Sequence, residues 1–218
     1  MKNIFLHGWG FSKEIWKEFF DLENSAFLDL PFHGESKFNG KNEILKKFSE
    51  EIYRKIENEK EPVNLIGWSL GATVSILVAL KKPENLQKMV LVGFSPKFKD
   101  ENLGHSPIAV KAFMISLKKD FEKTVINFRK TAAGKVFENI PLPEKIGSTA
   151  LLKEFIDLDL TEVLKDIDIE TIFIHGKNDK ITNYKGSVFS AEKVKNSKLV
   201  LTDGNHAHFL EDKKLILG

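Results

Sequence analysis

The sequence of 218 residues contains no cysteine. Without cysteine, the chain cannot form a disulfide, use a thiol nucleophile or build a cysteine-ligated zinc site. It also lacks an apolar run of the length that a transmembrane helix needs. The apolar stretch within Met1–His7 is too short for a signal peptide. We therefore expect a cytoplasmic protein with no membrane partner.

Neither sign of charge dominates the chain. Lysine and arginine total 33 against 31 aspartate and glutamate, which leaves a formal net charge of +2. This balance argues against a nucleic-acid partner, because such proteins carry a strong basic excess. The composition, with 42% hydrophobic and 29% charged residues, is ordinary for a globular protein, and the length fits one domain.

Short apolar runs alternate with helical patterns over much of the chain. This alternation predicts a mostly parallel sheet with helices on both faces. The expected strands are Asn3–Leu6, Ala26–Leu30, Val63–Ile66, Lys88–Val92, Thr171–Ile174 and Lys198–Leu201. The expected helices between them are Lys13–Leu22, Asn42–Asn58, Leu70–Lys81 and Lys185–Lys195.

The alternation stops in the middle of the chain. Amphipathic stretches at Ile108–Leu117, Phe121–Thr131 and Thr149–Asp157 follow one another with no strand between them. Such an insertion predicts a helical lid over the carboxyl edge of the sheet, where ligands bind in open α/β sheets. We therefore expect a core formed by residues 1–95 and 169–218, with a lid at residues 96–168.

The segment Gly67-Trp68-Ser69-Leu70-Gly71 carries the strongest chemical signal. It joins a buried strand to a buried helix, and a serine between two glycines at such a turn is a nucleophile elbow. The turn exposes the serine hydroxyl and aims the first amides of the helix at the group that the serine attacks. Alone, the motif could also be an ordinary glycine and serine turn.

A serine nucleophile needs a base and an orienting carboxylate, in the chain order Ser, Asp, His for this architecture. Asp179 follows the strand Thr171–Ile174, and His206 follows the strand Lys198–Leu201. Both therefore belong to loops at the same sheet edge as Ser69. Alone, Asp179 would be read as a turn residue; together, the three predict a catalytic triad.

Two neighbours compete for these roles. His208 is the rival base, but a position two residues further on should point elsewhere, to line the pocket or face solvent. Asp203 is the weaker rival acid, because it lies too close in sequence to His206.

The segment His7-Gly8-Trp9-Gly10 follows the first strand. Acyl transfer places negative charge on the carbonyl oxygen, and two preorganised amides stabilise it. We assign these donors to Leu70, directly after the nucleophile, and to Trp9. His7 is expected to brace the loop. The alternative is that the glycines only shape a turn.

These segments resemble the α/β-hydrolase superfamily. Two further segments share the resemblance, Asp29-Leu30-Pro31-Phe32-His33-Gly34-Glu35-Ser36 and His206-Ala207-His208-Phe209. More narrowly, the chain is similar to the BioH-type pimeloyl-ACP methyl ester carboxylesterases of biotin synthesis. The residues that carry this narrower similarity are the tryptophan pair Trp9 and Trp68, Ser95-Pro96 and Thr124-Val125-Ile126-Asn127-Phe128. The resemblance implies an α/β-hydrolase fold and a monomer without cofactor or metal. It also implies an acyl carrier protein as partner and hydrolysis of the methyl ester that this partner carries.

The resemblance further implies residues that bind substrate. They are Trp9, Trp68, Leu70, Phe128, Thr131, Ala132 and Lys123, with Lys123 at a position where the family uses arginine to hold the carrier protein. Two departures from the family are a missing N-terminal hairpin and a short last helix. Between Lys97 and Lys145 there are ten basic residues and six acidic ones, an excess of four positive charges. This excess would attract an acidic partner. The alternative is that these lysines only keep the exposed helix faces solvated.

Six phenylalanines in this part of the chain have two interpretations. Most should form the lid core, and a subset should form an apolar slot for an acyl chain. They are Phe94, Phe98, Phe113, Phe121, Phe128 and Phe155. The triad does not fix the substrate, so a generalist short-chain carboxylesterase and a C–C bond hydrolase stay open. A non-catalytic binding protein with the same fold is the alternative from another class.

Overall fold

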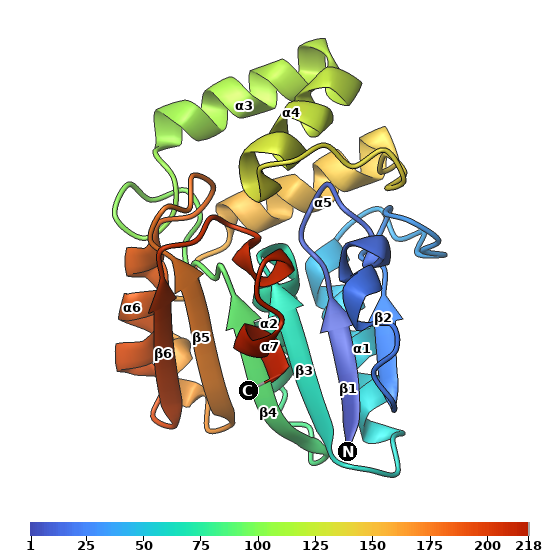
Figure 1. Ribbon diagram of the computed structural model, residues 1–218, viewed down its shortest axis with the longest axis vertical. Helices are drawn as coiled ribbons and strands as arrows, with labels where there is room; N and C mark the ends of the chain where they lie inside the picture. Colours follow the sequence, from blue (N-terminus) through green and yellow to red (C-terminus); the bar gives the residue numbers. More distant parts are fainter. Residues whose placement is uncertain (218) are drawn as a thin grey trace.

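The computed structural model describes residues 1–217, which form a six-stranded sheet with helices on both faces (Figure 1). Every neighbouring pair of strands runs parallel, in the order β2-β1-β3-β4-β5-β6. The six expected strands are confirmed, with ends that differ by one or two residues. They are β1 (Lys2–Leu6), β2 (Ser25–Leu28), β3 (Val63–Trp68), β4 (Leu86–Val92), β5 (Glu170–Gly176) and β6 (Ser197–Thr202).

Each face of the sheet packs against its own helices. Successive strand residues point to opposite faces, so Ile4 and Leu65 belong to one core and Phe5 and Ile66 to the other. The first core includes α1 (Ile44–Glu57) and α2 (Leu70–Ala79), and α6 (Tyr184–Lys193) packs beside β5 and β6. Because both faces are covered, the strands are continuous apolar runs, as the sequence indicates.

The second core is built on short elements. These are the 3₁₀ helices η1 (Lys13–Phe19) and η3 (His208–Leu210) and the four-residue helix α7 (Lys214–Leu217). The expectation of a longer α-helix at Lys13–Leu22 was therefore wrong. The segment winds as a 3₁₀ helix, which is typical of short connecting turns. A further 3₁₀ turn, η2, spans Leu164–Asp166.

Three helices lie between β4 and β5 in the sequence, and they sit above the carboxyl ends of the strands (Figure 1). They are α3 (Pro107–Lys119), α4 (Phe121–Ala133) and α5 (Lys145–Asp157), and we call residues 96–168 the helical insertion. Asp120 caps α4 by accepting a hydrogen bond from the Lys123 amide, which separates α4 from α3. Among residues 1–217, no helix has the length and apolar character needed to cross a membrane.

Candidate active site

Ser69 occupies the junction between β3 and α2. Its backbone has φ 55° and ψ −116°, and its amide is held by a 2.8 Å hydrogen bond to the carbonyl of Val92. A side chain on Gly67 would place its Cβ 2.6 Å from the carbonyl oxygen of Gly71. The elbow therefore needs glycine at position 67, and the strained serine conformation is of the kind found at functional sites.

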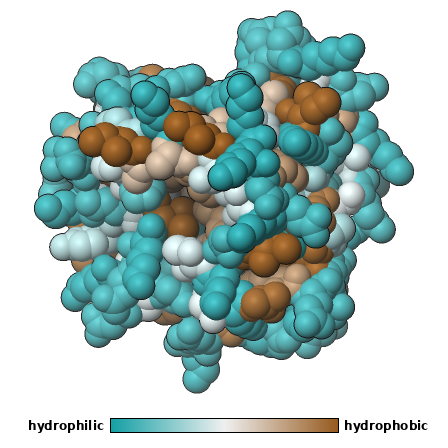
Figure 2. All heavy atoms as spheres, turned by 90° about the horizontal axis from the view of Figure 1, so that it is seen from above, coloured by the Kyte–Doolittle hydropathy of each residue, from teal (hydrophilic) through white to brown (hydrophobic). Residues whose placement is uncertain are grey.

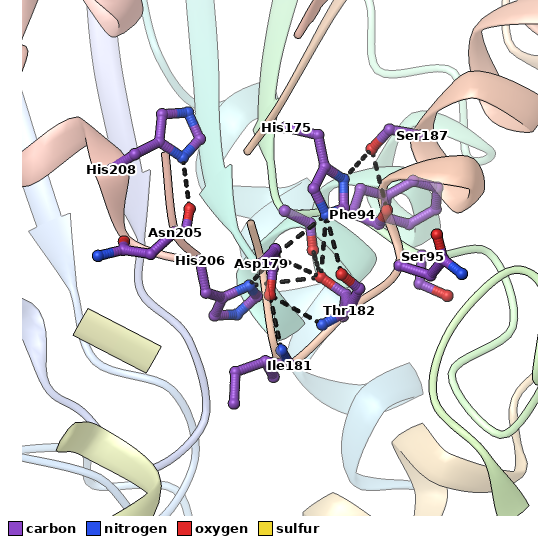
Figure 3. A network of polar contacts seen from close by, with 12 residues as sticks. Phe94, Ser95, His175, Asp179, Ile181, Thr182, Ser187, Asn205, His206 and His208 are labelled. Carbon is purple, nitrogen blue, oxygen red and sulfur yellow. Dashed lines mark hydrogen bonds and ion pairs between the residues drawn. The ribbon is translucent and has the colours of Figure 1, made fainter. Parts of the chain in front are cut away.

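Asp179 and His206 meet at the carboxyl edge of the sheet, from the loops after β5 and β6. His206 Nδ1 lies 2.6 Å from Asp179 Oδ2, and both side chains are only 1% exposed (Figure 3). His206 Nε2 is buried and has no hydrogen-bond partner within residues 1–217. The ring therefore donates a proton to the carboxylate from one nitrogen and keeps the other nitrogen free.

The Asp179 carboxylate is held from several sides. Its Oδ1 accepts the amides of Ile181 at 2.7 Å and Thr182 at 3.0 Å, and its Oδ2 accepts the Thr182 hydroxyl at 2.9 Å. Burial alone would raise the pKa of the Asp179 carboxyl, but His206 and His175 hold it well below its ordinary value. Asp179 therefore stays ionised and fixed in orientation.

The loop of Trp9 lies beside the nucleophile. A Cβ on Gly8 would lie 3.2 Å from the Cβ of Ser69, so the loop backbone approaches the serine closely. Trp9, Ser69 and Leu70 line the same cavity. The Leu70 amide, as the first of its helix, has no partner within that helix. The two residues expected to supply the oxyanion donors therefore lie beside the serine.

Two histidines brace this loop. His7 donates from Nδ1 to the carbonyl of Gly8 at 2.7 Å, and its Nε2 accepts the Leu30 amide at 3.0 Å. His33 accepts the Gly10 amide at Nε2, also at 3.0 Å. Burial, with His7 close by, lowers the pKa of His33 to about 3, so this ring stays neutral. Bracing by His7 is as the sequence predicts.

Arg129 fixes the same loop from the side of the helical insertion. Its guanidinium donates to the carbonyl oxygens of Gly10, Ile140 and Pro141 at 2.6, 2.7 and 2.7 Å, and the residue is 3% exposed. Burial lowers its pKa to about 10, which leaves it charged at neutral pH. Gly10 is therefore held at its amide by His33 and at its carbonyl by Arg129.

An apolar cavity of about 80 Å³ opens next to Ser69. We call it the inner cavity, and apart from Ser69 and His105 its lining is apolar. It is lined by Trp9, Ser69, Leu70, Phe98, His105, Val110, Phe113, Phe128, Leu152, Phe155, Ile156 and Ile181. Four of the six phenylalanines considered for an acyl slot are in this set; Phe94 and Phe121 are not.

A groove of about 490 Å³ continues outward from the inner cavity and shares His105, Phe113, Phe128 and Ile181 with it. We call it the outer groove. Its polar part is mainly basic, with Lys119, Lys123 and Lys180 against Asp120. The substrate-binding candidates Lys123 and Thr131 lie in this groove rather than beside the serine.

Two other candidates do not line either space. Trp68 is fully buried in the second core, where its indole nitrogen donates to the carbonyl of His206 at 2.8 Å. Ala132 is also fully buried there, and its carbonyl accepts the Ala207 amide at 3.1 Å. Both predictions are corrected: these residues support the His206 loop from the core side and do not form the wall of the cavity.

The two rival residues, His208 and Asp203, do not occupy the positions of the base and the acid. His208 is 3% exposed and bonds through Nδ1 to the carbonyl of Asn205, so it neither faces solvent nor lines the inner cavity as expected. Burial lowers its pKa. The Asp203 side chain is 92% exposed and lies 3.9 Å from Lys177, away from His206.

Three residues of this network were not predicted from the sequence. His175 and Thr182 contact Asp179, and Arg129 contacts the Trp9 loop. His175 stands four residues before Asp179, at the end of β5, which is the one signal that could have suggested it. Nothing local marks Arg129, because its three acceptors come from distant or irregular segments.

Comparison with known proteins agrees with this architecture. The family model described as serine aminopeptidase, S33, matches residues 43–213. A protein of Nitrosospira multiformis named pimeloyl-[acyl-carrier protein] methyl ester esterase is 28% identical over 238 residues, which cover 95% of this chain and 88% of that protein. One of the same name from Wigglesworthia glossinidia brevipalpis is 29% identical over 232 residues, covering 95% and 87%.

Solved structures share the fold. A bromoperoxidase from Bacillus anthracis superposes with a TM-score of 0.84 at 20% identity, covering 98% of this chain and 88% of that one. An esterase from Exiguobacterium antarcticum gives a TM-score of 0.83 at 20% identity, with the same coverage. At this level of identity the likeness establishes the α/β-hydrolase fold.

Proposed function

Because the chain belongs to the serine aminopeptidase S33 family of hydrolases, we propose that it is a serine carboxylesterase acting on an acyl ester. In this proposal residues 1–95 and 169–218 form the catalytic core and residues 96–168 act as its lid. The observation that carries the proposal is the buried Asp179–His206 pair, whose free Nε2 stands at the sheet edge of the Ser69 elbow.

The chemistry follows from these groups. His206 Nε2 takes the hydroxyl proton of Ser69 as Oγ attacks the ester carbonyl carbon. The amides of Trp9 and Leu70 hold the resulting oxyanion. The bond to the alcohol oxygen then breaks, and the alcohol leaves with the proton from His206. Water, deprotonated by His206, then attacks the acyl carbon. The bond to Ser69 Oγ breaks, His206 returns its proton to Oγ, and the acid is released. Asp179 keeps its charge throughout and stabilises the imidazolium.

The inner cavity favours an acyl ester over a peptide with a free amino terminus. An aminopeptidase needs a negative group to hold the substrate ammonium, yet the residues that line the inner cavity include no carboxylate. An apolar lining with one histidine suits an alkyl chain.

We further propose that the acyl group is pimeloyl methyl ester carried on acyl carrier protein, as the names of the relatives suggest. The part of the helical insertion between Lys97 and Lys145, where basic residues exceed acidic ones, supports an acidic partner. Among the described residues, the unpaired exposed lysines of this part are Lys111, Lys118, Lys119, Lys123, Lys130, Lys135 and Lys145. The other three basic residues counted there are engaged, since Lys97 and Lys99 pair with Asp159 and Asp157, and Arg129 is buried.

The same surface exposes apolar side chains, which Figure 2 shows as separate brown patches among hydrophilic residues in the view from above. In the helical insertion these are Ile108, Ile115, Ile126, Val136, Leu142 and Ile146. A mixture of exposed lysine and isoleucine is suited to a partner that presents both acidic and apolar groups.

The test is methanol release from pimeloyl-ACP methyl ester, compared with hydrolysis of free p-nitrophenyl butyrate. Turnover of the carrier-bound ester that is lost in Ser69→Ala supports the whole proposal. Activity on the free ester alone retains the esterase and discards the carrier protein. No activity on either ester overturns the enzyme assignment.

A charge reversal tests the partner. Lys123→Glu, in the outer groove, should raise KM for the carrier-bound ester by about tenfold while leaving the free ester unaffected. Lys55→Glu, on exposed α1 and away from the outer groove, is the matched control and should change neither. An equal response of the two variants removes the outer groove from carrier recognition.

A further inference from the structure

A second histidine contacts the Asp179 carboxylate. His175 stands at the end of β5, is fully buried, and places Nε2 3.1 Å from Asp179 Oδ2 (Figure 3). The same oxygen lies 2.6 Å from His206 Nδ1. One carboxylate oxygen therefore lies between two imidazole rings, of which the proposed mechanism uses only that of His206.

The other nitrogen of His175 shows where its proton lies. His175 Nδ1 is 2.7 Å from Ser187 Oγ, which is in turn 3.0 Å from the carbonyl oxygen of Phe94. If the Ser187 hydroxyl donates to Nδ1, the neutral ring carries its proton on Nε2. If the Ser187 hydroxyl instead donates to the Phe94 carbonyl oxygen, His175 Nδ1 must carry a proton in order to donate to Ser187. A lone pair on Nε2 would then face the Asp179 carboxylate, which is unfavourable, so Nε2 is expected to carry a proton as well. Nε2 also lies 3.3 Å from the Thr182 carbonyl oxygen, which can only accept, and 3.2 Å from the Thr182 hydroxyl. A proton on Nε2 is therefore shared between Thr182 and the Asp179 carboxylate.

The contact of His175 with Asp179 Oδ2 competes with the hydrogen bond from His206. Each donor to Asp179 Oδ2 withdraws negative charge that would otherwise stabilise protonated His206. The neutral and charged forms of His175 act in the same direction, since a cation at this place would also oppose a second cation on His206. Either way, the carboxylate has less negative charge left to stabilise the imidazolium of His206.

We propose that His175 is a positioning residue that shares the Asp179 carboxylate with His206 and so sets the pH above which the esterase is active. The inference rests on the proposed function, because it concerns the base of that reaction.

Other titratable groups near this cluster are few. His105 comes from the helical insertion and His208 from η3, and burial lowers the pKa of each. Lys177 and Lys180 are exposed and line a groove that also reaches Asp179. Among residues 1–217 none of these groups makes a hydrogen bond or ion pair with the Asp179 carboxylate, whereas His175 Nε2 forms an ion-pair contact with it at 3.1 Å.

The experiment is the pH dependence of kcat/KM for p-nitrophenyl butyrate. In His175→Leu, the midpoint of the acid limb should move upward by about half to one pH unit, because the donor is gone. In His175→Gln, the side-chain amide can still donate, so the midpoint should stay within about 0.3 units of the wild-type value. A purely structural role would lower the plateau without moving the midpoint.

Ser190→Ala provides the control. Ser190 is a buried hydroxyl on the same helix as Ser187, and it bonds to the carbonyl of Gly186 rather than to the cluster. Its loss should leave the acid limb in place. A folded His175→Leu with the wild-type midpoint overturns the proposal.

Two measurements separate this inference from the proposed function. The rate at which a fluorophosphonate labels Ser69 can be followed against pH without any ester substrate, with Ser69→Ala as blank. The ¹⁵N shifts of the wild-type histidines give the protonation of His175 Nε2 directly, with His175→Gln for assignment, even if the leucine variant does not fold. An unprotonated Nε2 at neutral pH overturns the proposal whatever the substrate proves to be.

Discussion

Arg129 Nε on helix α4 donates a 2.6 Å hydrogen bond to the carbonyl oxygen of Gly10, the residue that follows Trp9. The contact joins the helical insertion to the loop expected to hold the oxyanion. Since His33 holds the amide of the same glycine, the loop is fixed between core and insertion. A change in the helical insertion can therefore reach the reacting carbonyl without touching substrate.

Replacing Arg129 tests this connection. Arg129→Met removes the donor to three carbonyl oxygens, so we expect a loss of about 2–4 kcal/mol in the free energy of unfolding. We also expect a lower kcat at nearly unchanged KM, because the oxyanion is bound mainly in the transition state. Urea unfolding and steady-state kinetics measure the two effects. Lys130→Met, exposed on the same helix, should change neither; a matching loss there would contradict the assignment.

His33 makes stability depend on pH. Its pKa falls from an ordinary value near 6.5 to about 3 in the folded chain, mainly through burial. Below about pH 6.5 His33 binds a proton in the unfolded chain but stays neutral in the folded chain. The free energy of unfolding therefore falls by up to about 1.4 kcal/mol per pH unit until about pH 3. This stabilisation is complete above pH 6.5 and is lost as the pH falls.

The comparison is between wild type and His33→Gln, in which the side chain can still accept the Gly10 amide but does not titrate. Between pH 6.5 and 4, the free energy of unfolding should fall less steeply in the variant. Parallel curves would show that His33 is not the group responsible.

The elbow glycine Gly71 should tolerate no side chain. A Cβ there would lie 2.6 Å from the carbonyl oxygen of His7 and closer still to that of Leu6, both backbone atoms. We expect Gly71→Ala to cost about 3 kcal/mol or more in thermal or urea unfolding. Gly134→Ala is the contrast: its φ is +70°, but the nearest atom is 3.6 Å away, so only about 1 kcal/mol should be lost. Equal losses would contradict the steric argument.

The assignment of the triad acid can be checked against its sequence neighbour. Asp179→Asn should lower kcat by about 10⁴-fold, because the neutral amide no longer fixes or stabilises the protonated His206 ring. Asp203→Asn removes an exposed carboxylate and should leave kcat within about twofold, as a surface change does. If Asp203→Asn were the damaging change, the acid would have been assigned to the wrong loop.

The sheet could be predicted because its signals are local. Strands buried on both faces appear as apolar runs, and the residues after two such runs, Asp179 and His206, must then share an edge with Ser69. The elbow could be predicted for the same reason, since its glycines are required by steric contacts within one turn.

The remaining parts of the site depend on contacts that no local pattern encodes. Trp68 resembles a pocket residue in the sequence, yet its indole N–H finds the carbonyl of His206 on the core side, across 138 positions. Arg129 resembles a surface residue of an amphipathic helix, but it is buried because irregular loops present three carbonyls to it. His175 resembles one more residue of a buried strand, and only the arrangement of the loop after β5 brings it to Asp179.

The position of the helical insertion has a consequence for folding. β4 and β5 are neighbours in the sheet, but residues 93–169 separate them in the chain. The first four strands can pair before this long loop closes, and loop closure adds an entropic barrier to the β4–β5 pairing. Ser69 lies on one side of that join, with Asp179 and His206 on the other. The recovery of activity during refolding should therefore report the joining of two preformed halves, and lag behind the recovery of secondary structure.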